Sequence, residues 1–163
     1  MYVERSKLRL TEAELQELVA QAPCAHIATV SADGEPHVTP LGVVLEGGAL
    51  YMVSMRRSRR DRDIDRGSPV AVCIDHWGST HARHRGAVFY GSCRTAPDDG
   101  ALRRAKTTFA AKYYHDPTHD PSRAATHRWL ILEPERVVTW DFRKIPDGAD
   151  GVSTEQLSGD VTN

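Results

Sequence analysis

The chain has 163 residues, of which 40% are hydrophobic and 26% charged, with a formal net charge of −1. These values predict one globular domain and exclude the strongly basic balance expected of a nucleic-acid binder. No apolar run is long enough to span a membrane and no signal-peptide pattern opens the chain, so we expect a cytoplasmic protein without a membrane partner. Cys24, Cys73 and Cys93 lie in apolar runs, which predicts buried, reduced strand residues.

The first third of the chain predicts one helix and three strands. Thr11 and Glu14 have capping-box spacing ahead of an apolar face, so we expect a helix at about 12–21. Strands are expected at about 24–30, 36–45 and 49–55, with hairpin turns at Asp33-Gly34 and Gly47-Gly48. Pro40 inside the second strand favours a sheet edge or a bulge.

A basic stretch follows the third strand. Arg56, Arg57, Arg59, Arg60, Arg62 and Arg66 fall within about three predicted helical turns. Ser58 can cap this helix, with Asp61 as a weaker partner three residues on. Free amides at a helix N-terminus and forked guanidinium donors both favour a phosphate. The alternative is a solvated helix whose arginines are balanced by Asp61, Asp63 and Asp65.

The remaining elements alternate between strands and one long helix. Strands are expected at about 69–76 and 86–95, the latter interrupted by Gly91, and again at 127–133 and 136–142. Asp98 and Asp99 open a helix whose apolar stripe is Leu102, Ala105, Phe109 and Tyr113. Polar loops are expected at 77–85 and 115–126. A single domain should cover 1–144, followed by a flexible acidic tail at 145–163.

The fold class is therefore mainly β with flanking helices. Most of the connections between strands are short hairpins, so the sheet should be antiparallel. Six or seven short strands of this kind close into a small barrel, which removes exposed sheet edges.

The ordered segments HIATV, DGEPHVTPLGVVLEGGALYMVS, SRRDRDI, SPVAVCID and RGAVFYGSC, with LEPERVVTWDF near the end, carry a resemblance. Over about residues 12–142 the chain resembles the pyridoxamine 5′-phosphate oxidase-like family of FMN-binding split barrels. That family includes flavin- and deazaflavin-dependent oxidoreductases that use FMN or F420. The resemblance implies an antiparallel split β-barrel.

The resemblance also implies a cofactor site. Ser54 matches a small hydroxyl residue that reaches the cofactor phosphate, and Ser58 with Arg59 or Arg60 matches the basic turn that follows. Many members have Lys where this chain has Arg60, and Asn where it has Asp63. The family's second strand lies along the ring system, which implicates His37, Val38, Thr39, Pro40 and Leu41.

The implied function is a flavin- or deazaflavin-dependent oxidoreductase that transfers hydride to or from a small organic substrate, with FMN as cofactor and F420 as the alternative. Members are usually homodimers with a shared cofactor site, so Trp129, Trp140 or the 77–85 loop of the partner could complete it. Two rivals are a non-catalytic binder of flavin, F420 or haem, and an interaction module that has lost its cofactor.

The sequence singles out no catalytic acid or base. His37 is the best titratable candidate, and a surface strand histidine explains it equally well. Two histidine groups have loose metal-like spacing: His76, His81 and His84, and His115, His119 and His127. They fall in or beside predicted loops without cysteine partners or paired carboxylates at ligand spacing, so we expect no metal site.

Overall fold

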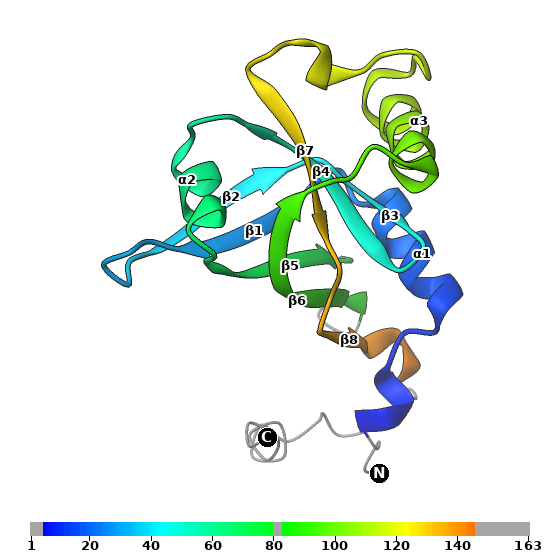
Figure 1. Cartoon of the computed structure of the whole chain (residues 1–163). Helices are drawn as coiled ribbons and strands as arrows, with labels where there is room; N and C mark the ends of the chain where they lie inside the picture. The colour runs from blue at the N-terminus through cyan, green and yellow to red at the C-terminus, as the bar shows by residue number, and fades with distance from the viewer. Residues whose placement is uncertain (1–4, 80–82, 146–163) are drawn as a thin grey trace.

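Most helix and strand boundaries follow local signals in the sequence. The computed structural model describes residues 5–79 and 83–145 (Figure 1). The strands are β1 (Ala25–Val30), β2 (Pro36–Leu41), β3 (Val43–Glu46), β4 (Ala49–Met55), β5 (Pro69–His76), β6 (Arg85–Thr95), β7 (His127–Leu132) and β8 (Arg136–Asp141). The helices are α1 (Glu12–Gln21), α2 (Arg59–Asp65) and α3 (Gly100–Tyr114), with 3₁₀ turns η1 (Arg5–Leu8), η3 (Pro121–Arg123) and η4 (Phe142–Lys144). Apart from Ile145, the predicted tail at 145–163 lies outside the described residues.

The capping signals behave as predicted. The Thr11 hydroxyl accepts a hydrogen bond from the Glu14 amide, and the Glu14 carboxylate accepts one from the Thr11 amide at 2.7 Å. These reciprocal bonds satisfy two amides that the first turn of α1 leaves without a partner. The Asp99 carboxylate caps α3 by accepting from the Leu102 amide at 2.9 Å.

The basic helix is shorter than the three turns that the arginine run predicted. Arg57 takes a left-handed backbone conformation with φ of 63°, so helical geometry begins only at Arg59. The Arg56 amide instead donates to the Thr126 carbonyl at 2.8 Å. Arg56 and Arg57 therefore belong to the turn that precedes the cap at Ser58, and α2 has seven residues.

The strands form a curled antiparallel sheet in the order β2-β1-β5-β6-β7-β4-β3, with β8 paired to β6. Every strand pair is antiparallel, as the short hairpins predicted. The sheet curls until β2 contacts β4, which gives the split barrel seen in Figure 1. Helix α2 lies at one side of this barrel, and α1 and α3 lie at the other (Figure 1).

There are eight strands in the described residues because the predicted strand at 36–45 is broken at Gly42. A Cβ at Gly42 would lie 2.8 Å from the Phe109 ring, so only glycine lets α3 approach the backbone there. The break turns the chain from β2 into β3. β6 continues through Gly91 without a break. It pairs with β8 up to Tyr90 and with β5 up to Ser92, and with β7 from Cys93 onward.

Alternating side chains from the strands fill the barrel. Inward positions of β1, β4, β5 and β6 are fully buried, including Ile27, Met52, Val72 and Phe89, and α1 closes one end with Leu18. The alternation explains why the predicted strands bury one face. The three cysteines form no disulfide. Each is half-buried, whereas the sequence predicted that they would be buried.

A second apolar layer joins α3 to the outer face of β3, β4 and β7. Phe109 packs edge-on against Trp129 with ring centroids 5.1 Å apart, and Tyr51 and Ile131 lie in the same cluster. The Trp129 indole is 4% exposed and donates to Asp120 Oδ1 at 3.2 Å. Trp129 is therefore a core residue of its own chain. This burial differs from the sequence-based expectation that Trp129 could complete the cofactor site of a partner subunit. Among the described helices, none is long and apolar enough to cross a membrane.

Candidate functional site

The turn between β4 and α2 assembles the residues that the sequence singled out for an anion. β4 delivers Ser54, whose side chain is fully buried. Ser58 caps α2, because its hydroxyl oxygen accepts from the Asp61 amide at 3.2 Å. This cap uses an oxygen lone pair and leaves the hydroxyl proton available, so Ser58 can still donate to a ligand.

Arg60 links three elements at this turn. Its Nε donates to Ser54 Oγ on β4 at 3.4 Å, and its Nη1 donates to Thr39 Oγ1 on β2 at 2.5 Å. Three of the predicted site residues, Thr39, Ser54 and Arg60, are thus in direct contact. Two hydroxyls and one guanidinium group converge at the point where β2, β4 and α2 meet.

Arg60 forms no ion pair with a carboxylate in the described chain, although the nearby charge of Asp61 favours its protonated form. Within the described chain, the neighbouring basic side chains have other partners: Arg59 lies 2.9 Å from Glu35 Oε2, Arg66 pairs with Asp63, and Arg62 donates to the Arg57 carbonyl. The hydrogen bonds of Arg60 in the described chain go to the hydroxyls of Ser54 and Thr39. Burial lowers the pKa of Arg60, but an arginine stays protonated at neutral pH all the same. A half-buried cation held by hydroxyls is well suited to accept an anion.

Arg128 supports the site from β7 and was missed from the sequence. It lies opposite Ser54 in the β4–β7 register. Its Nε donates to Asp61 Oδ1 and its Nη2 to Asp65 Oδ1, each at 2.7 Å. Asp61 in turn accepts from the Arg57 amide at 2.8 Å. This network holds the turn ahead of α2 in place. It could not be predicted from a local sequence pattern, because Arg128 is 67 positions from Asp61.

Asp63 has a structural place inside the protein. Its carboxylate accepts from the Thr29 hydroxyl at 2.9 Å and also pairs with Arg66. Both Thr29 and Asp63 are 1% exposed. Asp63, which stands where many family members have Asn, therefore has its partners in Thr29 of β1 and in Arg66 at the end of α2. Arg60 is not among these partners.

The five candidate residues of β2 divide between two faces of the strand. Thr39 faces Arg60, and His37 is half-buried and Leu41 buried on that same face. Val38 and Pro40 alternate with them and lie exposed on the other face, where Val38 is 59% exposed. The structure brings Thr39 to the predicted phosphate residues, and it does not bring all five residues to one surface.

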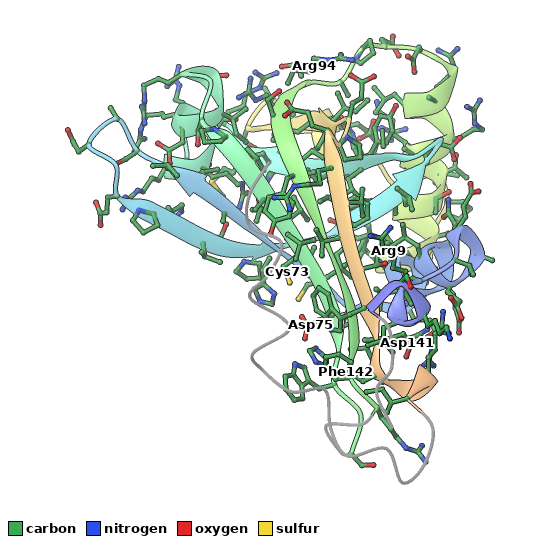
Figure 2. The ribbon with its side chains drawn as sticks, turned by 90° about the horizontal axis from the view of Figure 1, so that it is seen from below. Arg9, Cys73, Asp75, Arg94, Asp141 and Phe142 are labelled. Carbon is green, nitrogen blue, oxygen red and sulfur yellow. The ribbon has the colours of Figure 1, made fainter. Side chains whose placement is uncertain are left out.

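The outer face of β2, β1, β5 and β6 carries a row of apolar side chains. Cross-strand neighbours run from Val38 through Ala28 and Ala71 to Tyr90, by the registers of β2-β1-β5-β6. Cys73, also half-buried, lies on this face of β5 and points the same way as Asp75 two residues on (Figure 2). Val38 is exposed, Ala28, Ala71 and Tyr90 are half-buried, and the Arg136 guanidinium lies 3.9 Å from the centroid of the Tyr90 ring.

Two ionisable side chains, Asp61 and Cys93, interact electrostatically with Arg60. Cys93 on β6 is close enough to feel its charge, and burial raises the pKa of that thiol to about 12. The other contacts of Arg60 are hydroxyls. In the described parts of the chain, no three metal-binding side chains cluster together; His81 lies outside them.

Comparisons with known proteins agree with this architecture. A protein with the fold of this chain is the conserved hypothetical protein Rv2991 from Mycobacterium tuberculosis, with 22% identity, a TM-score of 0.73, and coverage of 93% of this chain and 99% of that one. The FAD and heme binding protein from Mycobacterium smegmatis aligns with 23% identity and a TM-score of 0.67, over 88% of this chain and 77% of that one. HutZ, the heme storage protein from Vibrio cholerae, aligns with 14% identity and a TM-score of 0.60, over 79% and 94%.

These three likenesses show the fold. No curated protein sequence matches the chain. The sequence itself matches the family model described as pyridoxamine 5′-phosphate oxidase over residues 11–141, which takes in every strand described above. This chain belongs to the pyridoxamine 5′-phosphate oxidase family.

Proposed function

We propose that this protein binds a flavin cofactor through its phosphate, with FMN first and F420 second among the candidates, and that it works as an oxidoreductase on a small organic molecule. The observation that carries the proposal is the contact of Arg60 with Thr39 and Ser54, without a carboxylate partner in the described chain. A guanidinium group donates two parallel hydrogen bonds to phosphate oxygens. The hydroxyls of Thr39, Ser54 and Ser58 add neutral donors around the same point.

In this proposal the protein holds the phosphate and excludes water, while Arg128 and Asp61 keep the α2 turn in place. A bound flavin would supply the hydride chemistry. The hydroxyls and the thiol around Arg60 do not titrate near pH 7, so acid–base steps would fall to the cofactor or to the substrate. His37, half-buried on the same face as Thr39, remains the candidate for a proton-transfer role.

We also propose that two copies of the chain pair through the outer sheet face and share the site. The row from Val38 to Tyr90 would then be covered by its counterpart, with Trp140 and the loop at 77–85 available to the partner's cofactor. The partly exposed apolar row, in which Val38 is 59% exposed, supports this arrangement. Light scattering should give about twice the chain mass of 18.1 kDa; a monomer at micromolar concentration would contradict it.

A non-catalytic binder is the second candidate. It fits the structural neighbours that are named as a FAD and heme binding protein and a heme storage protein, and it needs only the hydroxyl and guanidinium contacts that Arg60 makes. Such a protein would hold its cofactor through the same phosphate or carboxylate contacts. It would carry out no turnover.

One experiment separates these possibilities. The protein is purified, any bound small molecule is identified by mass, and the apoprotein is titrated with FMN, FAD, F420 and haem. The preferred complex is then mixed anaerobically with NADH, NADPH or reduced F420. Bleaching of the oxidised cofactor band, followed by recovery on adding an acceptor, supports the oxidoreductase. Tight binding without bleaching by any donor supports the binder, and binding of none of the four contradicts the proposed cofactor site.

A further inference from the structure

The side of the barrel opposite α2, the helix that carries Arg60, is formed by α1 and α3 (Figure 1). A groove of about 690 Å³ runs between α1, β3 and α3. Its lining residues include Val19, Ala20, Val44, Leu45, Lys112 and His115. None of them belongs to the proposed flavin site. The walls are mainly apolar, and no carboxylate is among the lining residues.

Lys112 is held at the edge of this groove by two backbone carbonyls. Its Nζ donates to Val19 O at 2.7 Å and to Val43 O at 3.1 Å. The Val19 carbonyl belongs to the last turn of α1, where no helical amide can reach it. The Tyr113 ring covers another side, with its centroid 4.7 Å from Nζ. A neutral amine has two N–H groups and one lone pair, so two carbonyls can take both protons.

The four lysines of the chain differ in their partners. Lys106 pairs with Asp120 at 2.9 Å, Lys144 pairs with Glu14 at 2.6 Å, and Lys7 is exposed. Lys112 has no carboxylate partner in the described chain. Burial lowers its pKa to about 8, and the nearby Cys24 thiol opposes this shift. The other titratable groups that face it are the Tyr113 hydroxyl, whose pKa burial raises, and His115 on the groove wall.

We propose that Lys112 is a nucleophilic amine that forms a reversible imine with small apolar aldehydes bound in this groove. The amine nitrogen attacks the carbonyl carbon, a C–N bond forms, and the carbonyl oxygen leaves as water with the two amine protons. When the imine is protonated, its one N–H can still donate to the Val19 carbonyl. The apolar walls formed by Val19, Ala20, Val44 and Leu45 suit a short hydrocarbon chain beside the reacting carbon.

This site is independent of the flavin site, since the two share no residue. The lone pair needed for attack is free only on the unprotonated amine. At pH 7.5 an amine with a pKa of about 8 is roughly one quarter neutral, whereas one with a pKa of about 10.5 is roughly one thousandth neutral. A less basic amine is also a weaker nucleophile, which offsets part of the gain from the larger neutral fraction. We therefore expect Lys112 to react about tenfold faster than an ordinary lysine.

The test uses competition among the lysines within one molecule. The full chain is incubated with butyraldehyde and cyanoborohydride, which reduces the imine to a stable secondary amine, and peptide mapping by mass gives the rate at each lysine. We expect Lys112 to react about tenfold faster than Lys7 at pH 7.5, with a rate that saturates with butyraldehyde, is half-maximal near pH 8 and levels off above about pH 9. Equal rates at Lys7 and Lys112, or a rate at Lys112 that climbs steadily to pH 10, would overturn the proposal.

Two variants control for the groove and for the amine. Ala20 is exposed and lines the groove, so Ala20→Phe should fill it and slow the labelling of Lys112 about tenfold while Lys7 is unchanged. Lys112→Arg keeps the charge and the donors but forms no imine, so it should abolish the fast adduct. An Ala20→Phe protein that labels as fast as the parent would show that the groove plays no part. FMN titration of each variant should match the parent, which keeps this result separate from the flavin site.

Discussion

Arg128 on β7 and Asp61 on α2 form a nearly buried ion pair, with Nε 2.7 Å from Oδ1 and side chains 10% and 6% exposed. Arg128 is also the cross-strand neighbour of Ser54 on β4. It therefore ties the sheet to the helix that carries Arg60. A second contact from Arg128 to Asp65 strengthens the tie from the exposed side.

Replacing Arg128 with Met should destabilise the protein markedly. The change leaves the Asp61 carboxylate buried without its cation, which costs about 3–5 kcal/mol in comparable pairs. Arg94→Met is the matched control, because Arg94 pairs with Glu133 at a surface where the side chains are 54% and 64% exposed. Such a pair contributes about 0–1 kcal/mol. In thermal melting, the midpoint of Arg128→Met should fall much further than that of Arg94→Met. Equal falls for the two variants would contradict the role given to Arg128.

Asp63→Asn tests whether this acid belongs to the structure or to the anion site. Asparagine keeps an oxygen for the Thr29 hydroxyl but loses the charge that Arg66 requires, so we expect a stability loss of about 1–3 kcal/mol. Affinity for FMN should stay the same or fall slightly. A clear gain in FMN affinity would mean that Asp63 repels the phosphate, contrary to its observed contacts.

Gly42→Ala probes the close approach of α3 to the barrel. The added Cβ would lie 2.8 Å from the Phe109 ring, which is itself held by Trp129. Overpacking of this kind costs about 1–3 kcal/mol. Gly100→Ala, at the start of α3, has its nearest neighbour at 3.4 Å on a flexible arginine and serves as the control. Urea denaturation should show a loss for Gly42→Ala and little change, or a gain, for Gly100→Ala.

The contact of Glu14 with Lys144 predicts a pH dependence. Hydrogen bonds from Lys144 and from the Thr11 amide lower the pKa of Glu14 from 4.5 to about 2. A depressed folded-state pKa contributes stability above the unfolded value, so this contribution should be present above about pH 4.5 and fade as the pH falls toward 2. Glu14→Gln should therefore lower the melting midpoint at pH 7, with a difference from the parent that shrinks below pH 4.5. A constant difference down to pH 2.5 would exclude this assignment.

The features foreseen from the sequence are those with local causes. The caps at Thr11 and Ser58, the glycine turns and the alternation of β1 and β5 each depend on residues a few positions apart. The break at Gly42 could not be foreseen, because it depends on Phe109 in α3. Arg128 was missed for the same reason, since only the β4–β7 register places it beside Asp61. Arg60 was predicted as a phosphate residue, whereas its contact with Thr39 required the curl that brings β2 against β4.

Salt dependence should distinguish F420 from FMN. Arg56, Arg57 and Arg62 are exposed around the turn, in excess of what one phosphate needs, and can attract the acidic tail of F420. Screening weakens such exposed contacts more than the half-buried contacts of Arg60. Isotherms at two salt concentrations should show F420 affinity falling more steeply than FMN affinity. If F420 binds at micromolar and FMN only at millimolar concentration, the order of the two cofactors proposed above is wrong.

The most direct test of the account is the FMN affinity of Arg60→Met compared with its affinity for riboflavin, which has the same ring system without the phosphate. Losing one charge-assisted contact costs about 1.5–3 kcal/mol, so FMN should bind roughly ten- to a hundredfold more weakly. Riboflavin binding should not change, and Arg62→Met, an exposed position on the same helix, should bind FMN like the parent. If Arg60→Met binds FMN as tightly as the parent does, or loses riboflavin and FMN affinity equally, Arg60 does not hold the phosphate.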